Sequence, residues 1–162
     1  MFNFFKKSAK STDLSLYAMT EGCLKAITAV DDEVFSTKMM GDGFAIEPQS
    51  DDIFAPGAGE VTSVFPTKHA ITFKLTNGAE ILLHMGLDTV ELAGAPFDVL
   101  VKEGDQVTAE TPVAKMDRKA IEDDGKGTDV IIVVTNTDQF QLPEIPAKDV
   151  QQGEEIGAIK EK

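Results

Sequence analysis

The sequence predicts an all-β protein, an antiparallel sandwich or barrel built from many short strands. Glycines and prolines separate short runs rich in β-branched residues, such as 59–65, 107–116 and 130–135. Helical periodicity is weak and is confined to about 112–124 and 146–152. Many short strands at close spacing, with little helix between them, are typical of sandwiches and barrels.

Internal self-similarity supports the same class. Residues 18–27 (AMTEGCLKAI) resemble residues 55–64 (APGAGEVTSV). At a second constant offset, the apolar positions of 107–116 match those of 150–159. Two overlapping repeats of this kind fit a fold made of two related, interlocked halves.

We expect one domain, residues 14–162, preceded by a flexible tail of residues 1–13. A chain of 162 residues is long enough for one sizeable core. The tail combines three phenylalanines with three lysines, which suits either a frayed terminus or at most a weak contact between residues 1–10 and a membrane surface. No apolar run approaches the roughly 20 residues that a membrane-spanning helix needs.

The chain is strongly acidic, with a formal net charge of −13 and an isoelectric point near 4.4. This balance argues against nucleic acid as a partner, because phosphate backbones need patches of lysine and arginine. Surplus carboxylates either attract a basic protein partner or simply keep the protein in solution. The single cysteine, Cys23, allows no internal disulfide, and the N-terminus lacks the order of a signal peptide. We therefore expect a cytoplasmic protein.

The two histidines, His69 and His84, lie in a segment that predicts a β-hairpin. Asn77-Gly78 stands between alternating apolar runs and is the strongest short-range signal for a two-residue turn. Such a turn would pair Ile71 with His84 and place His69 diagonally beside His84 on one face. A slip of one residue would send one histidine to the other face. Three further side chains would share the histidine face: Thr67, Phe65 and Leu82.

Two converging imidazoles suit phosphoryl transfer. A neutral imidazole has a pKa of about 6.5 and is a nucleophile near neutral pH, while a second imidazole can donate a hydrogen bond to the phosphate oxygens. A zinc site is a competing interpretation. Catalytic zinc usually takes three protein ligands, so Asp88 would have to join the two histidines. A role in the core is the remaining alternative for each histidine.

Six motifs in order along the chain resemble one known family. The clearest is ILLHMGLDTVEL at 81–92. The others are VFSTKMMGDGFAIEP (34–48), FAPGAG (54–59), PTKHA (66–70), VKEGDQV (101–107) and VVTNTD (133–138). Together they are similar to the glucose-type enzyme IIA family of the bacterial phosphoenolpyruvate-dependent sugar phosphotransferase system, and the first resembles its active-site signature.

The resemblance implies an antiparallel β-sandwich, also described as a barrel-sandwich hybrid with internal duplication. It implies that His84 accepts a phosphoryl group on Nε2 from the phosphohistidine of the carrier protein HPr and passes it to a cysteine of an enzyme IIB domain. His69 would assist this transfer, Thr67 would orient His69, and Asp88 would supply an acidic group at the edge of the site. We expect no cofactor and no metal.

The same resemblance implies a phosphocarrier rather than a self-sufficient enzyme. We expect it to be free-standing, because no enzyme IIB or IIC sequence follows these motifs, and we take a monomer as the default. In some bacteria the unphosphorylated form of the family also binds and regulates other proteins. The sugar is not specified by these motifs, because specificity belongs mainly to the membrane component.

The partner surface of the family maps onto an apolar rim around the histidines. Its residues are Val34, Phe35, Met39, Met40, Phe65, Leu82, Met85 and Val90. Apolar surface excludes water from a labile phosphohistidine and gives a partner something to bury. The three methionines replace other apolar residues of the family, and flexible thioethers suit a surface that fits several partners.

Two other classes of protein have related β architectures. A lysostaphin-like metallopeptidase needs a histidine–aspartate pair and an HxH motif to hold zinc, and this sequence contains no HxH. A biotinyl or lipoyl carrier needs a modified lysine at an exposed turn, and Lys115-Met116 lacks the preceding methionine of a biotin site. The motifs therefore favour the phosphocarrier.

Overall fold

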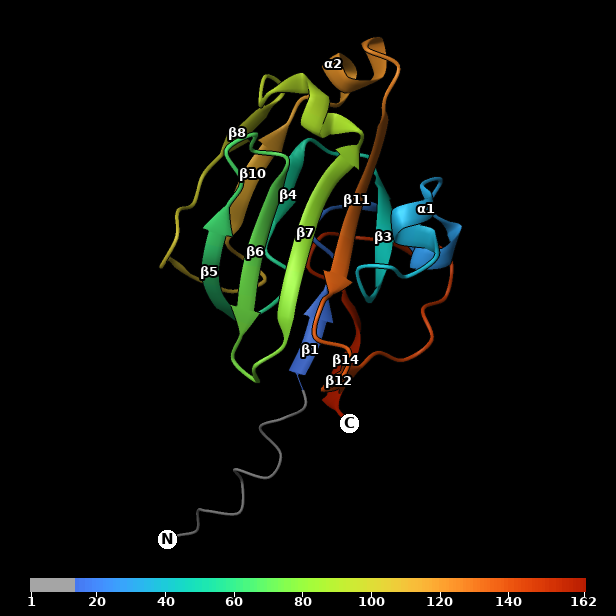
Figure 1. Cartoon of the computed structure of the whole chain (residues 1–162), viewed down its shortest axis with the longest axis vertical. Coiled ribbons are helices and arrows are strands. Elements are labelled where there is room, and N and C mark those ends of the chain that lie inside the picture. The colour runs from blue at the N-terminus through green and yellow to red at the C-terminus, as the bar shows by residue number, and fades with distance from the viewer. Residues whose placement is uncertain (1–13) are drawn as a thin grey trace, which may run out of the picture.

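Antiparallel strands dominate the computed structural model, which describes residues 14–162 (Figure 1). One sheet has eight strands in the order β13 (Lys148–Val150), β2 (Gly22–Ala26), β3 (Asp42–Pro48), β11 (Gly127–Val134), β7 (Glu80–Leu87), β6 (Ala70–Leu75), β5 (Gly59–Val64) and β9 (Gln106–Val107). Two smaller sheets have the orders β1 (Leu14–Tyr17), β14 (Glu155–Glu161), β12 (Phe140–Gln141) and β4 (Asp52–Phe54), β10 (Pro112–Met116), β8 (Phe97–Val99). The predicted all-β class is confirmed.

Helices are short and lie at the margins of the sheets. Within the described residues they are the 3₁₀ turns η2 (Ile27–Ala29) and η3 (Thr89–Leu92) and the α-helices α1 (Glu33–Ser36) and α2 (Arg118–Asp123). The helical periodicity at 112–124 is therefore only partly correct, because its first half forms β10. The weak helix at 146–152 is wrong, because β13 occupies this segment and pairs with β2. No helix among residues 14–162 is long and apolar enough to span a membrane.

The large sheet has two apolar faces, which follow from the alternation of side chains along each strand. Its inner face packs against the two small sheets, so Phe73 and Leu83 join Leu16 and Ile53 in the main core. Its outer face carries a second, smaller cluster beneath η2 and α1. This cluster contains Ile27, Val30, Phe35, Ala45, Ala70, Leu82, Ile131 and Val133.

The repeats seen in the sequence correspond to equivalent strand pairs. In one half β1 pairs with β14 and β2 with β13; in the other, β4 pairs with β10 and β5 with β9. Gly22 and Gly59 begin β2 and β5. A Cβ at Gly22 would lie 2.0 Å from the Glu47 carbonyl oxygen, and one at Gly59 would lie 2.5 Å from that of Lys74. Both copies of the first repeat therefore need glycine at this position, where neighbouring backbone approaches the strand.

The β6–β7 hairpin has a different register from the predicted one. Ala70, not Ile71, pairs with His84. The Leu75 N–H donates to the Ala79 carbonyl at 2.9 Å, so the loop has one residue more than the predicted two-residue turn. Gly78, with φ of 96°, takes the left-handed position of this longer loop. The two-residue turn is wrong because Thr76 belongs to the loop rather than to the strand.

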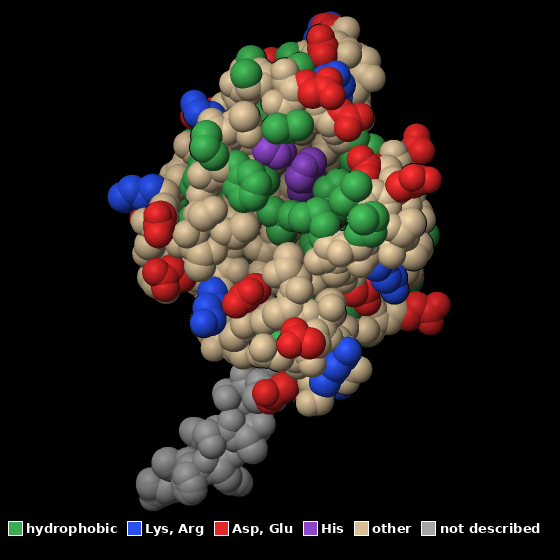
Figure 2. All heavy atoms as spheres, viewed as in Figure 1, with side chains coloured by type: hydrophobic (Ala, Val, Ile, Leu, Met, Phe, Trp, Pro, Cys, Tyr) green, Lys and Arg blue, Asp and Glu red, His purple; other side chains and the backbone are tan. Residues whose placement is uncertain are grey.

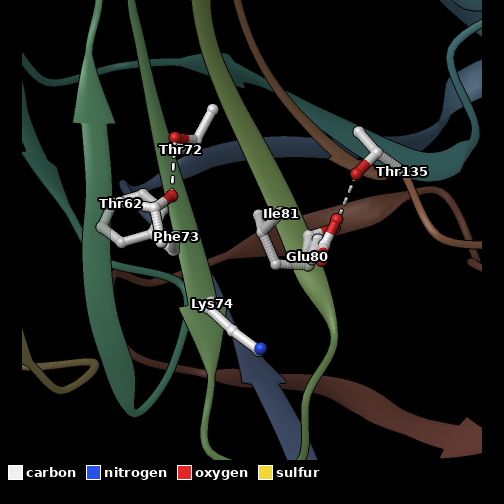
Figure 3. Close-up of a pocket in the computed structure, with 7 residues that line it drawn as sticks. All are labelled: Thr62, Thr72, Phe73, Lys74, Glu80, Ile81 and Thr135. Carbon is white, nitrogen blue, oxygen red and sulfur yellow. Dashed lines mark hydrogen bonds between the residues drawn. The ribbon is translucent and has the colours of Figure 1, made fainter.

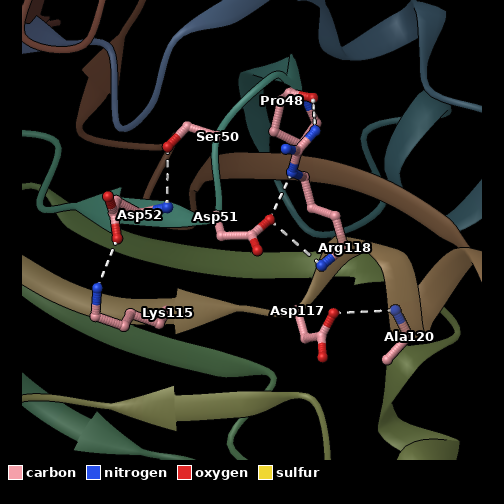
Figure 4. A network of polar contacts seen from close by, with 8 residues as sticks. All are labelled: Pro48, Ser50, Asp51, Asp52, Lys115, Asp117, Arg118 and Ala120. Carbon is pink, nitrogen blue, oxygen red and sulfur yellow. Dashed lines mark hydrogen bonds and ion pairs between the residues drawn. The ribbon is translucent and has the colours of Figure 1, made fainter.

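An ion pair and a hydrogen bond from Arg118 hold α2 against the end of β3 and the loop that follows it (Figure 4). Arg118 Nε lies 2.6 Å from Asp51 Oδ1, and Arg118 also donates to the Pro48 carbonyl at 3.2 Å. Asp117 caps the helix by accepting a hydrogen bond from the Ala120 N–H at 3.1 Å. These contacts order one end of the sandwich. The expected tail, residues 1–13, lies outside the described part of the chain.

Candidate functional site

His84 lies in the middle of the large sheet, on the outer face of β7. It is flanked by Ala70 on β6 and by Ile131 on β11. The small side chain of Ala70 leaves room beside the imidazole, and the Phe35 ring contacts that imidazole edge-on with centroids 4.9 Å apart. A strand paired on both sides gives the imidazole a rigid support.

The His84 imidazole is held in one tautomer by the next turn of its own chain. Its Nδ1 lies 2.9 Å from the Gly86 carbonyl oxygen. A carbonyl can only accept a hydrogen bond, so Nδ1 carries the proton in the neutral ring. Nε2 is therefore left with the lone pair. Gly86 has φ of 83°, a left-handed conformation that turns its carbonyl back toward the ring.

His69 reaches His84 from a turn rather than from a strand. The Phe65 N–H donates to the Ala70 carbonyl at 3.0 Å, the Lys68 N–H donates to the Phe65 carbonyl at 2.8 Å, and Lys68 has φ of 62°. His69 thus precedes β6, where strand alternation does not apply. Its ring centroid lies 5.0 Å from that of His84, at an interplanar angle of 80°. The predicted convergence of the two histidines is confirmed, although the register that led to it is wrong.

Thr67 lies beside His69, as predicted. Its Oγ1 and His69 Nδ1 are 2.6 Å apart, and either atom can be the donor. When the hydroxyl donates, His69 carries its proton on Nε2 and can donate a hydrogen bond from that atom. The Phe65 ring packs edge-on against His69 with centroids 5.5 Å apart. These two contacts therefore restrain the orientation of the ring.

Both imidazoles are neutral near pH 7. Burial and the nearby His69 lower the pKa of His84 to about 4, against the opposing effects of the Gly86 carbonyl and Asp32. Burial also lowers the pKa of His69, a residue that is only 6% exposed. Neutrality keeps the lone pair of His84 Nε2 available as a nucleophile.

Asp32 was missed by the sequence analysis. Its carboxylate accepts a hydrogen bond from the Val34 N–H at 2.9 Å, as the N-cap of α1, and lies close enough to His84 to act on its pKa. An aspartate just before a helical turn is a common capping signal. The sequence contains no comparable signal that α1 lies beside β7 in space.

Asp88 lies at the edge of the site. It is exposed, it has φ of 60°, and it precedes η3. Neither imidazole has a hydrogen bond to its carboxylate within the described residues. Among residues 14–162, no three side chains of the His, Cys, Asp and Glu types form a group able to hold a metal. The structure therefore does not supply the third ligand that the zinc interpretation requires.

An apolar rim surrounds the two histidines, and carboxylates lie outside it (Figure 2). Four of its residues are well exposed, namely Val34 (43%), Met39 (75%), Met40 (40%) and Val90 (48%). Phe65 is partly buried, whereas Phe35 and Leu82 lie beneath the rim in the smaller cluster. The prediction that Met85 belongs to the rim is wrong. Met85 is fully buried in the main core, because its side chain points to the opposite face of β7 from His84.

A groove of about 350 Å³ continues along the sheet (Figure 3). Its Thr72 end lies two residues along the strands from the Ala70–His84 pair, because Thr72 pairs with Leu82. Thr62 and Thr72 are joined by a hydroxyl hydrogen bond of 2.7 Å, and Thr135 lies on the other side of the groove. The sheet face thus changes from apolar around the histidines to hydroxyl-rich below them.

Comparison with known proteins places the chain in a family. The family model for the phosphoenolpyruvate-dependent sugar phosphotransferase system, EIIA 1, matches residues 14–140. The chain belongs to this EIIA family. The match includes both histidines, Thr67 and Asp88.

Individual EIIA relatives cover most of the chain. The glucose-specific EIIA component of Staphylococcus aureus (strain COL) is 43% identical over 136 residues, which are 84% of this chain and 82% of the relative. The glucose-specific EIICBA component of Staphylococcus carnosus (strain TM300) is 42% identical over 145 residues, 90% of this chain but 22% of that longer protein.

A solved structure of the same family confirms the predicted β-sandwich. Glucose permease IIA from Mycoplasma capricolum superposes with a TM-score of 0.82 at 35% sequence identity. The superposition covers 98% of this chain and 99% of the other. An EIIA-family chain takes part in the phosphoryl transfer that accompanies sugar uptake.

Proposed function

We propose that this EIIA-family protein accepts a phosphoryl group on His84 Nε2 from the phosphohistidine of HPr and passes it to a cysteine of an enzyme IIB domain. The observation that carries the proposal is the hydrogen bond between His84 Nδ1 and the Gly86 carbonyl at 2.9 Å. It leaves Nε2 as the nucleophilic nitrogen of a neutral imidazole. The family membership supports the reaction class, and the geometry supports the choice of atom.

His69 stabilises the transferring group. The His84 Nε2 lone pair forms the new P–N bond while the P–N bond of the donor breaks and leaves its electron pair on the donor imidazole. Negative charge stays on the phosphoryl oxygens, next to the His69 ring, whose centroid is 5.0 Å from that of His84. A hydrogen bond from His69 Nε2–H to these oxygens lowers the barrier, and Thr67 keeps His69 in the required tautomer.

The transfer from His84 to enzyme IIB uses the same groups in reverse order. The cysteine thiolate attacks the phosphorus, the P–N bond breaks, and the electron pair returns to His84 Nε2. Nδ1 keeps its hydrogen bond to Gly86 throughout, so the imidazole leaves in the tautomer in which it began. Asp88 and Asp32, at the edge of the site, add negative charge that favours a basic group on each partner.

Both partners bind the apolar rim. Exposed apolar side chains that surround a reactive group, with charged side chains outside them, resemble a protein interface with an apolar centre and a polar border (Figure 2). The net charge of −13 supports basic partner surfaces, because opposite charges accelerate encounter. The fused EIICBA relative, which carries EIIC, EIIB and EIIA in its name, supports an EIIB domain as the acceptor.

Several finer features belong to the same proposal. The relatives are named glucose-specific, which supports glucose as the sugar of the system served by this chain. Residues 14–162 form the EIIA domain, which works as a cytoplasmic monomer without a cofactor. In the unphosphorylated protein, the apolar rim is also the surface that a regulated protein would bind.

The test is incubation of the protein with labelled phosphoenolpyruvate, enzyme I and HPr. The wild type should acquire acid-labile, base-stable label, and His84→Gln should acquire none. His69→Gln should acquire label but pass it slowly to enzyme IIB. Label that persists on His84→Gln would show that another residue carries the phosphoryl group. Metal analysis separates the peptidase interpretation, which requires about one bound zinc per chain.

A further inference from the structure

Thr89 is a buried threonine that the proposed transfer does not use. It is the first residue of η3, and none of its side-chain surface is exposed. Its Oγ1 donates a hydrogen bond of 2.5 Å to the Met85 carbonyl. Met85 stands between His84 and Gly86, so this hydroxyl is attached to the backbone that connects the nucleophile to its hydrogen-bond acceptor.

The Thr89 methyl group also closes on Gly86. A Cβ at Gly86 would lie 2.4 Å from Thr89 Cγ2 and 3.0 Å from the Gly127 carbonyl oxygen on β11. Gly86 is therefore enclosed between Thr89 and a neighbouring strand, in a left-handed conformation with φ of 83°. The enclosure limits the ways in which the Gly86 peptide can rotate.

The Met85 residue joins both histidines to Thr89. Its N–H donates to the His69 carbonyl at 2.8 Å, while its carbonyl accepts from Thr89. The backbone directly after His84 is thus fixed at two points, the N–H and the carbonyl of Met85. A buried carbonyl left without its partner would be costly, so the hydroxyl resists any rotation of this segment.

We propose that Thr89 is a positioning residue for His84. Its hydroxyl fixes the Met85–Gly86 backbone so that the Gly86 carbonyl faces His84 Nδ1, and this keeps the proton on Nδ1 and the lone pair on Nε2. The inference rests on the proposed function, in which Nε2 is the nucleophile. Without the hydroxyl, the carbonyl loses its alignment and the imidazole can place its proton on either nitrogen.

Two substitutions separate the hydroxyl from the shape of the side chain. Thr89→Val keeps the shape and removes the hydroxyl, whereas Thr89→Ser keeps the hydroxyl and removes the methyl group. Thr20→Val is the matched control, because Thr20 is equally buried and its Oγ1 has no hydrogen-bond partner among residues 14–162. Circular dichroism establishes that each variant is folded.

The first measurement is the tautomer of His84, read from the ¹⁵N shifts of its two ring nitrogens near pH 7. The wild type, Thr89→Ser and Thr20→Val should each show protonated Nδ1 and unprotonated Nε2. Thr89→Val should show a mixture of tautomers. A purely structural role would lower the stability of Thr89→Val without moving these shifts, and that result would overturn the proposal.

The second measurement is the rate of label uptake from HPr. Thr89→Val should be slower by roughly tenfold, the factor that corresponds to one hydrogen bond, while Thr89→Ser stays near the wild-type rate. A shifted tautomer in Thr89→Ser would also overturn the proposal, since the hydroxyl would then not be sufficient. If the wild type takes up no label, the proposed function fails, and the tautomer measurement still decides the role of Thr89.

Discussion

Acid should destabilise the wild-type protein more than a His84→Gln variant. Burial and the neighbouring His69 lower the pKa of His84 to about 4 in the folded protein, from 6.5 in an unfolded chain. Between these two values the unfolded chain binds more protons at this position than the folded protein. The stability that depends on neutral His84 is therefore complete above pH 6.5 and is lost as the pH falls toward 4.

The magnitude follows from the size of the pKa depression. Each pKa unit corresponds to about 1.4 kcal/mol, so acidification from about pH 7 to about pH 4 should cost the wild type about 3 kcal/mol through His84 alone. This is a large part of the roughly 5–15 kcal/mol by which a folded domain is stable. Urea unfolding of both proteins at these two pH values measures it. The carboxylates titrate in both proteins, so their effect cancels in the difference.

An equal loss of stability in the wild type and in His84→Gln would refute the physical reasoning. It would mean that the imidazole is protonated as easily in the folded protein as in the unfolded chain. An NMR titration of the His84 ring provides an independent check, and a midpoint near 6.5 would contradict the burial argument. The His69→Gln variant should keep most of the acid sensitivity, because burial is the largest cause of the low pKa.

Three further variants test other parts of the site. His69→Gln should raise the pKa of His84, because it removes the charge that opposes protonation, and an NMR titration measures the shift. Thr67→Val should leave the final extent of His84 labelling intact but slow phosphoryl transfer, including transfer to enzyme IIB, by roughly tenfold, and Thr67→Ser should restore the rate. Val34→Gln should weaken HPr binding by about tenfold in calorimetry; Leu100→Gln, equally exposed at 44% but beside a different sheet, should have no effect.

The fold class was predictable because its signals are local. Glycines and prolines mark the strand ends, and β-branched runs fill the strands between them. The hairpin register was not predictable in the same way. Asn77-Gly78 is compatible with both a two-residue and a longer loop, and the choice depends on whether Thr76 pairs in the sheet. A loop longer by one residue shifts the register by one residue, and this changes every cross-strand partner between β6 and β7.

The candidate site was only partly predictable from the sequence. His69 and His84 do converge, but His69 lies in a turn and not on a strand. This turn depends on a left-handed conformation of Lys68, which no short sequence motif predicts. Met85 could have been excluded from the apolar rim, since neighbouring residues of a strand point to opposite faces and His84 points outward. Asp32 could not have been included, because its proximity to His84 depends on how α1 packs on the sheet.

The apolar rim encloses both histidines on a single face. In the proposed function the donor and the acceptor both bind this rim, so they compete directly for it. The donor must leave before the acceptor can bind, and turnover follows ping-pong kinetics in which an excess of either partner slows the relay. Tighter binding would therefore not make a faster carrier. The useful affinity is the one at which each partner stays long enough for one transfer and then dissociates.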